Sequence, residues 1–169
     1  ARDWAVQKFR DFGYTDVSTP TFEWSNTTQY NVMAVKQGYA EPDKVIVVGG
    51  HYDSIVMEAS PGRMIYAPGA DDNGSGSAAV LELARVLADV PLRKTVVFML
   101  FSAEEVGLIG SRAAARQFAE DGVDVEVEAR VDTAVDDVVS PVVAVTVAAS
   151  RLTFLGRVRI HAAVSANTS

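Results

Sequence analysis

Hydrophobic side chains recur at regular spacings along the chain and predict its first elements. Residues 2–13 place apolar side chains three to four positions apart and end at a glycine, which is typical of an amphipathic helix. Residues 16–24 and 29–36 predict two β segments separated by a polar turn of four residues. Residues 45–48 are four branched apolar residues in a row, and they predict a strand buried on both faces.

A second group of elements follows a long loop over residues 54–70. Residues 75–89 predict a helix with one apolar stripe, residues 95–101 a second buried strand, and residues 108–121 another helix. Strands that alternate with helices indicate parallel strands whose connections cover both faces. We therefore expect an α/β fold: a three-layer, mostly parallel (mixed) sheet with helices on both faces.

The end of the chain has a different composition, because it is rich in valine and poor in glycine. It predicts β segments at residues 126–134, 141–148 and 155–160. No internal repeat or linker separates this part from the rest. We interpret residues 1–169 as a single domain.

Composition and charge narrow the possible partners. A net charge of −7 argues against nucleic acid, because binding to phosphates requires a basic face. No apolar run approaches the roughly 18 residues of a membrane span. The sequence begins without a basic and then apolar leader, so we expect a targeting segment to have been removed or to lie outside it, and we expect a secreted, extracellular protein. Without cysteine, any metal must be bound by histidine, aspartate and glutamate.

Three polar clusters stand next to the predicted buried elements. They are His51 with Asp53, Asp71 with Asp72, and Glu104 with Glu105. In parallel sheets ligands gather beyond the carboxyl ends of the strands, which is where these clusters fall. Imidazole and carboxylate groups suit one or two Zn²⁺ ions, with a spare carboxylate left to act as a base.

Each cluster also has a structural interpretation. His51 and Asp53 lie on the same side of an extended segment, so Asp53 can hold one ring nitrogen while the other binds a metal. A buried histidine bonded to a nearby acid for structural reasons is the more common case for such a pair alone. Glu104 and Glu105 can equally form a solvated pair at the start of a helix.

The cluster at Asp71 and Asp72 lies in a glycine-rich segment before a predicted helix. It can be a polar turn whose Ser75 caps that helix. A glycine-rich turn before a helix is also found in phosphate sites, but two adjacent aspartates would repel the phosphate. A single carboxylate here could instead bridge two cations.

Together the clusters resemble the zinc exopeptidases of the M28 (aminopeptidase Y/S) family. The resemblance runs from about residue 30 to residue 132, and residues 133–169 are atypical. The matching motifs are Asn31-Val32-Met33-Ala34, Val47-Val48-Gly49-Gly50-His51-Tyr52-Asp53-Ser54, Ala67-Pro68-Gly69-Ala70-Asp71-Asp72-Asn73-Gly74-Ser75-Gly76 and Phe101-Ser102-Ala103-Glu104-Glu105-Val106-Gly107-Leu108-Ile109-Gly110-Ser111.

This resemblance implies a zinc-exopeptidase fold, incomplete at its C-terminus, and a set of metal ligands for two Zn²⁺ ions. One ion takes His51 and Asp132, the other takes Glu105, and Asp72 bridges both. The family holds the peptide bond after Asp72 in the cis form. Its last ligand is a histidine far downstream; the only other histidine here is His161, which is either a displaced substitute or a surface residue.

The resemblance also implies the chemistry. Glu104 is expected to act as the general base and Asp53 to act through His51. The implied activity is that of an aminopeptidase that removes N-terminal residues from peptide substrates. The alternatives are a carboxypeptidase, a member similar to glutaminyl cyclases, and a non-catalytic interaction domain or fragment that lacks one zinc ligand.

Overall fold

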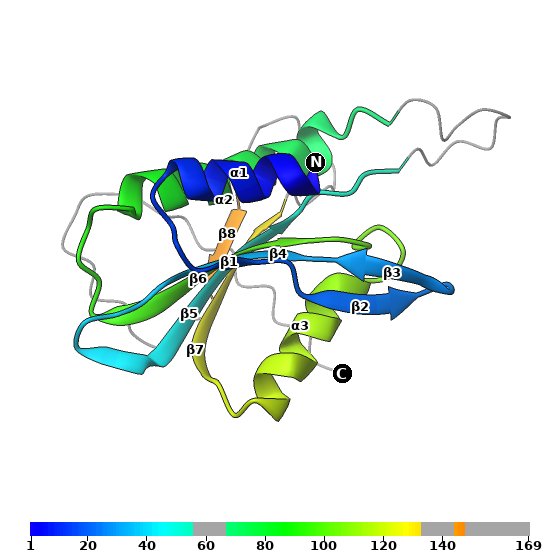
Figure 1. Ribbon diagram of the computed structural model, residues 1–169. Coiled ribbons are helices and arrows are strands. Elements are labelled where there is room, and N and C mark those ends of the chain that lie inside the picture. Colours follow the sequence, from blue (N-terminus) through cyan, green and yellow to red (C-terminus); the bar gives the residue numbers. More distant parts are fainter. Residues whose placement is uncertain (56–66, 133–143, 148–169) are drawn as a thin grey trace, which may run out of the picture.

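The computed structural model of the chain describes residues 1–55, 67–132 and 144–147 (Figure 1). Within these residues a six-stranded mixed sheet forms the middle layer. Its three central strands pair in parallel, and the outer strands pair antiparallel. In sheet order the strands are β1 (Val17–Ser18), β4 (Val32–Lys36), β6 (Lys94–Phe101), β5 (Glu41–His51), β7 (Asp124–Asp132) and β8 (Ala144–Val147).

The mixed α/β sheet expected from the sequence is thus confirmed, with parallel pairing confined to its three central strands in the part described. Strand β5 extends beyond the predicted residues 45–48 at both ends. Strands β7 and β8 fall within or close to the predicted β segments. The segment predicted at residues 155–160 lies outside the described residues.

The N-terminal β segments divide further than predicted. A separate hairpin joins β2 (Thr21–Trp24) to β3 (Thr27–Tyr30), with Thr27 opposite Trp24. Ser25 and Asn26 between them have positive φ angles of 51° and 59°. Two positive φ angles allow a two-residue hairpin turn that matches the twist of the strands. The predicted four-residue turn was therefore too long, and its last two residues belong to β3.

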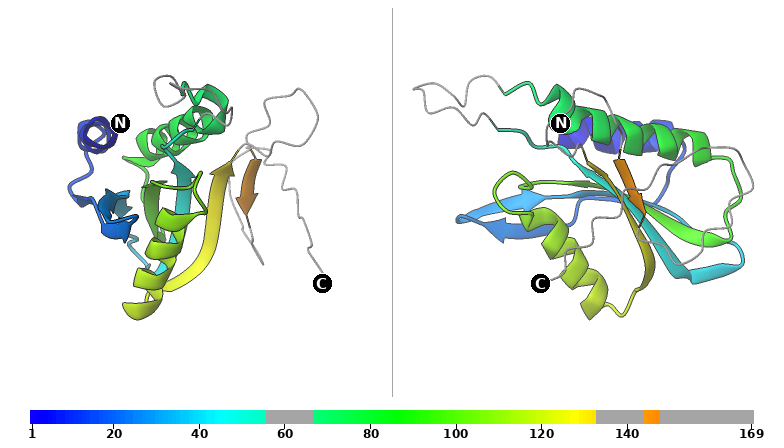
Figure 2. Two further views of the ribbon diagram at one scale, coloured as in Figure 1. Left: turned by 90° about the vertical axis from the view of Figure 1, so that its right-hand side faces the viewer. Right: turned by 180° about the vertical axis from the view of Figure 1, so that it is seen from behind.

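Helices cover both faces of the sheet. Helices α1 (Arg2–Asp11) and α2 (Gly76–Leu87) lie on one face, and α3 (Ile109–Glu120) lies on the other (Figures 1 and 2). The direction of winding explains this separation, because β6 and β7 lie on opposite sides of β5. Right-handed connections in opposite directions place their helices on opposite faces. No helix among the described residues is long and apolar enough to span a membrane.

Strand β6 is the centre of both hydrophobic cores. Val96, Phe98 and Leu100 pack in the cluster that includes residues of α1 and α2. The alternate residues Val97, Met99 and Phe101 pack in the cluster that includes Ala114 of α3. Because successive side chains of a strand point to opposite faces, a continuous apolar run fills both cores at once.

Phe98 is fully buried, and its ring centroid lies 5.7 Å from that of Tyr14 and 6.5 Å from that of Phe9. We expect Phe98→Ala to reduce the free energy of unfolding by about 3–5 kcal/mol, because it leaves a cavity between α1 and the sheet. Urea denaturation measures this loss. Val86→Ala, at an exposed position of α2, is the control and should change stability by about 0.5 kcal/mol or less. A similar small effect of both variants would contradict the assigned core.

Candidate metal centre

His51 ends the central strand β5 at the point where the winding of the sheet changes direction. In such sheets ligands bind beyond the carboxyl ends of the strands at this switch point. His51 pairs with Phe101 at the end of β6, so the segment after each strand begins at the same edge. The side chain of His51 is 3% exposed, and the Oγ of Ser77 on α2 donates to its carbonyl oxygen at 2.6 Å. The backbone of His51 is therefore held to α2, and its imidazole is buried.

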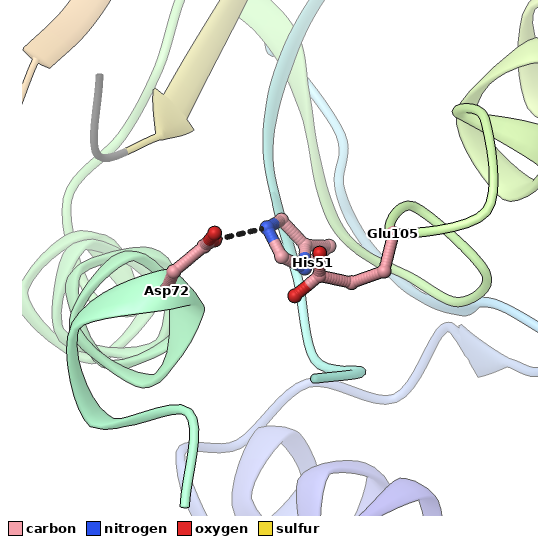
Figure 3. A group of neighbouring side chains, drawn as sticks. All are labelled: His51, Asp72 and Glu105. Carbon is pink, nitrogen blue, oxygen red and sulfur yellow. Dashed lines mark ion pairs between the residues drawn. The ribbon is translucent and has the colours of Figure 1, made fainter. Parts of the chain in front are cut away.

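Two carboxylates approach this imidazole from opposite sides (Figure 3). Asp72 comes from the start of the α2 region, and its Oδ1 lies 2.9 Å from Nε2 of His51. Glu105 comes from the segment after β6. One nitrogen or oxygen atom from each of His51, Asp72 and Glu105 lies within 4.8 Å of the others. A single cation between them could be held by all three.

The segment that carries Asp72 has a defined backbone. It forms η2 (Ala70–Ser75), a π-helical turn in which Asp72 and Asn73 depart from helical angles. The peptide bond between these two residues is cis, which confirms the form expected from the resemblance. Asn73 is buried, and its Oδ1 accepts from the amide of Gly76 at 2.8 Å. This contact fastens η2 to the first residue of α2.

Asp53 connects the loop after β5, to which it belongs, with the loop after β6, which carries Glu104 and Glu105. Its Oδ1 accepts from the amide of Glu104 at 3.2 Å, and its Oδ2 accepts from the amide of Glu105 at 3.3 Å. Nδ1 of His51 lies 3.1 Å from the carbonyl oxygen of Asp53 and 3.6 Å from its Oδ1. Asp53 therefore lies beside His51 as predicted, but its backbone oxygen is within hydrogen-bond distance of Nδ1 and its carboxylate is farther away. The bonds to the two glutamate amides were not predicted.

The charges around His51 favour a cation. Burial alone would lower the pKa of His51, but the carboxylates of Asp53, Glu104 and Asp72 outweigh it and raise the pKa to about 9. Burial and the charges of Asp72 and Glu104 raise the pKa of Glu105, against an opposing effect of His51. Such carboxylates repel one another unless a positive charge lies among them.

Burial would also raise the pKa of Asp53, but the imidazole of His51 and the two glutamate amides hold it below its ordinary value. Asp53 therefore remains ionised while it accepts these bonds. An ionised acceptor for the backbone and a converging set of one imidazole and two carboxylates fit a divalent metal such as zinc.

Glu104 and Asp132 occupy the same edge of the sheet. Oε2 of Glu104 lies 3.7 Å from Nε2 of His51, so this carboxylate borders the three converging donors. Asp132 ends β7, two residues beyond Arg130, which pairs with Gly49 of β5. The register therefore brings the backbone of Asp132 to the edge at which His51 lies, and its role as a ligand stays a prediction. His161 lies outside the described residues.

Comparison with known proteins identifies the family. The sequence model of Peptidase family M28 matches residues 31–152 of the chain. The chain belongs to this family. A probable zinc metalloprotease of Pyricularia oryzae is 36% identical over 141 residues, which make up 75% of this chain and 27% of the fungal protein. Leucine aminopeptidase 1 of Ajellomyces capsulatus is 42% identical over 104 residues, 58% of this chain and 26% of that enzyme.

A solved structure has a similar fold over part of its length. BSAP, a zinc aminopeptidase from Bacillus subtilis, matches with a TM-score of 0.54 and 35% identity over 64% of this chain and 25% of that one. The M28 chain described here thus spans less than a third of the length of these relatives.

Replacing Asp53 tests its place between the two loops. Asp53→Asn removes the charge beside His51 and one acceptor for the glutamate amides, so we expect zinc affinity to fall roughly 10–100-fold. Isothermal titration calorimetry measures the affinity. Asp89→Asn, an exposed position beyond the end of α2, makes the same change in charge and should leave the affinity unchanged. A crystal structure with an Asp53 oxygen bonded to zinc would refute the indirect role.

Proposed function

We propose that this M28 chain carries the metal-binding and base-bearing part of a zinc-dependent aminopeptidase. The convergence of His51, Asp72 and Glu105, with Glu104 at their border, is the observation that carries the proposal. The names of the relatives support zinc and aminopeptidase activity. Peptides with a free N-terminus are the proposed substrates, and the extracellular location stays a prediction.

The proposed mechanism divides the work among a few side chains. Zinc, when bound, supplies Lewis acidity, which makes water a stronger acid and polarises the peptide carbonyl. Glu104 accepts the proton that the attacking water loses and then donates it to the amine of the leaving group. Asp53 lies next to Nδ1 of His51 and Ser77 holds its backbone, so Nε2 would be the atom available to a cation. Asp53 remains ionised and keeps the amides of both glutamates in place.

The assignment of donors to two ions follows the resemblance. His51, Asp132 and Asp72 would hold one zinc. Asp72 and Glu105 would hold the other, together with a histidine that only His161 could supply in this sequence.

Activity and its dependence on zinc test the proposed class directly. The purified chain is assayed for zinc content and for hydrolysis of an aminoacyl anilide, before chelation, after chelation and after zinc is restored. An N-acetylated anilide and an N-acylated dipeptide with a free carboxylate are run beside it. Cleavage of the free-amine anilide alone supports an aminopeptidase, and cleavage of the acylated dipeptide indicates a carboxypeptidase. A chain that binds zinc but cleaves none of these substrates would be consistent with an interaction domain.

Glu104→Gln separates the base from the ligands. The variant cannot accept a proton, so we expect zinc content to be retained and kcat to fall by about 10² or more. Zinc analysis and steady-state kinetics measure the two properties. Glu120→Gln, at an exposed position on α3, should retain both. Full activity of Glu104→Gln, or loss of a stoichiometric amount of zinc, would contradict the proposed role.

The two ions should bind with unequal affinity. We expect one tight site that requires His51 and one weak site at Glu105, because two protein ligands with water hold zinc poorly. Activity should therefore increase with added zinc. Calorimetric titration of the wild type, His51→Ala and His161→Ala distinguishes the sites. Two equally tight sites that both survive His161→Ala would disprove the unequal pair, whereas loss of one site in that variant would assign His161 as a ligand.

A further inference from the structure

The connection between β6 and α3 carries both glutamates of the site, and hydrogen bonds join its own backbone groups. The amides of Gly107 and Leu108 donate to the carbonyl oxygen of Glu104 at 2.9 Å and 2.8 Å. The amide of Gly110 donates to the carbonyl oxygen of Ser102 at 3.1 Å. Residues 102–110 therefore form a compact turn whose two ends lie in contact. Whatever holds those ends also holds the backbone from which the glutamates project.

Asn31 holds both ends from a distant part of the sequence. Its Oδ1 accepts from the amide of Ser102 at 3.1 Å, and its Nδ2 donates to the carbonyl oxygen of Gly110 at 2.9 Å. Asn31 is 1% exposed, so water does not compete for these bonds. Without these bonds the buried amide of Ser102 and the carbonyl oxygen of Gly110 would lose a hydrogen-bond partner, which is unfavourable away from water.

Gly110 shows how closely the two parts approach. A Cβ at this position would lie 2.2 Å from the carbonyl oxygen of Ser102 and 2.5 Å from Oδ1 of Asn31. Both distances are far shorter than any van der Waals contact. Only glycine therefore allows Asn31 to reach the turn.

The residues just before Asn31 also contact the site loops. The Oγ of Ser102 donates to Oε1 of Gln29 at 3.4 Å. The hydroxyl of Tyr52, the residue after His51, donates to the carbonyl oxygen of Tyr30 at 2.6 Å. One short segment thus touches the loops that follow both β5 and β6.

We propose that Asn31 is a positioning residue that fixes Glu104 and Glu105 relative to His51. The inference rests on the proposed function, since it takes Glu104 as the base and Glu105 as a metal donor. Asp53 binds the amides of the two glutamates. Asn31 binds the two ends of the turn that carries them. His51 belongs to strand β5 and lies outside the turn. Loss of the Asn31 bonds therefore moves one side of the site relative to the other.

Asn31→Leu removes both bonds and keeps the number and branching of the heavy atoms in the side chain. Thr95→Val is a matched control at the opposite end of β6: the buried Thr95 hydroxyl donates to the carbonyl oxygen of Pro42 at 2.7 Å and accepts from the amide of Gly38 at 3.1 Å. Each variant removes the hydrogen bonds by which a buried side chain joins two backbone segments. Only the first of them touches the turn that carries the glutamates.

We expect both variants to lose stability, and only Asn31→Leu to change the site. Its kcat should fall about 10–100-fold with a small change in KM, because the base is misplaced. Its zinc affinity should weaken by about tenfold. Amide hydrogen exchange at Glu104 and Glu105, measured by NMR, should accelerate in Asn31→Leu and remain unchanged in Thr95→Val.

Gly110→Ala disrupts the contact between Gly110 and Asn31 by adding a methyl group on the side of Gly110. Gly110→Ala and Asn31→Leu disrupt the same contact. The kcat of the double variant should therefore be only slightly lower than that of either single variant. Asn31→Ser, whose smaller side chain leaves room for a bridging water, replaces Asn31→Leu if that variant does not fold, with the same expected split.

The proposal is overturned if kcat, zinc affinity and glutamate amide exchange are the same in the Asn31 variant as in Thr95→Val. Independent, multiplicative losses in the double variant would also overturn it. A wild-type chain without zinc or hydrolysis would refute the proposed function instead, and amide exchange at the glutamates would still decide whether Asn31 holds their turn.

Discussion

The reversal of winding at β5 is the constraint on which the site depends. The chain passes from β5 to β6 on one side and returns to β7 on the other, so α2 and α3 cover opposite faces. The space above the end of β5 is therefore bordered by the start of α2 and by the segment that leads into α3. His51 occupies that position, with Asp72 and Glu105 entering from the two borders. A single topological feature thus gathers donors that lie far apart in the sequence.

Precise placement within this space comes from polar side chains that are buried or half-buried. Asp53 accepts the amides of both glutamates, Ser77 holds the carbonyl of His51, and Asn73 joins η2 to α2. Each of these bonds ties one loop to another element. Because buried hydrogen bonds are costly to leave unmade, they restrict the loops to one arrangement more sharply than apolar packing does.

The carboxylates of the site repel one another. Asp53, Asp72, Glu104 and Glu105 surround one imidazole, and the raised pKa values of His51 and Glu105 reflect their mutual effect. Such a cluster is unfavourable in isolation and favourable around a cation. The membership of the chain in the M28 family and the donor set of the site thus agree on metal-dependent chemistry.

The sequence by itself determined the order of the main elements and the polar clusters that lie at one edge of the sheet. The apolar run of β6 predicted a strand buried on both faces, and the paired acids after it predicted a cluster at the carboxyl edge, because the pattern of apolar and acidic residues is a local property of the sequence. The two-residue turn at Ser25 and Asn26 depended on backbone angles that composition does not specify. The contacts of Asp53 with the glutamate amides and of Asn31 with Ser102 and Gly110 join residues 51 to 79 positions apart. Only the tertiary structure could decide them, since they exist only once the strands have paired in register.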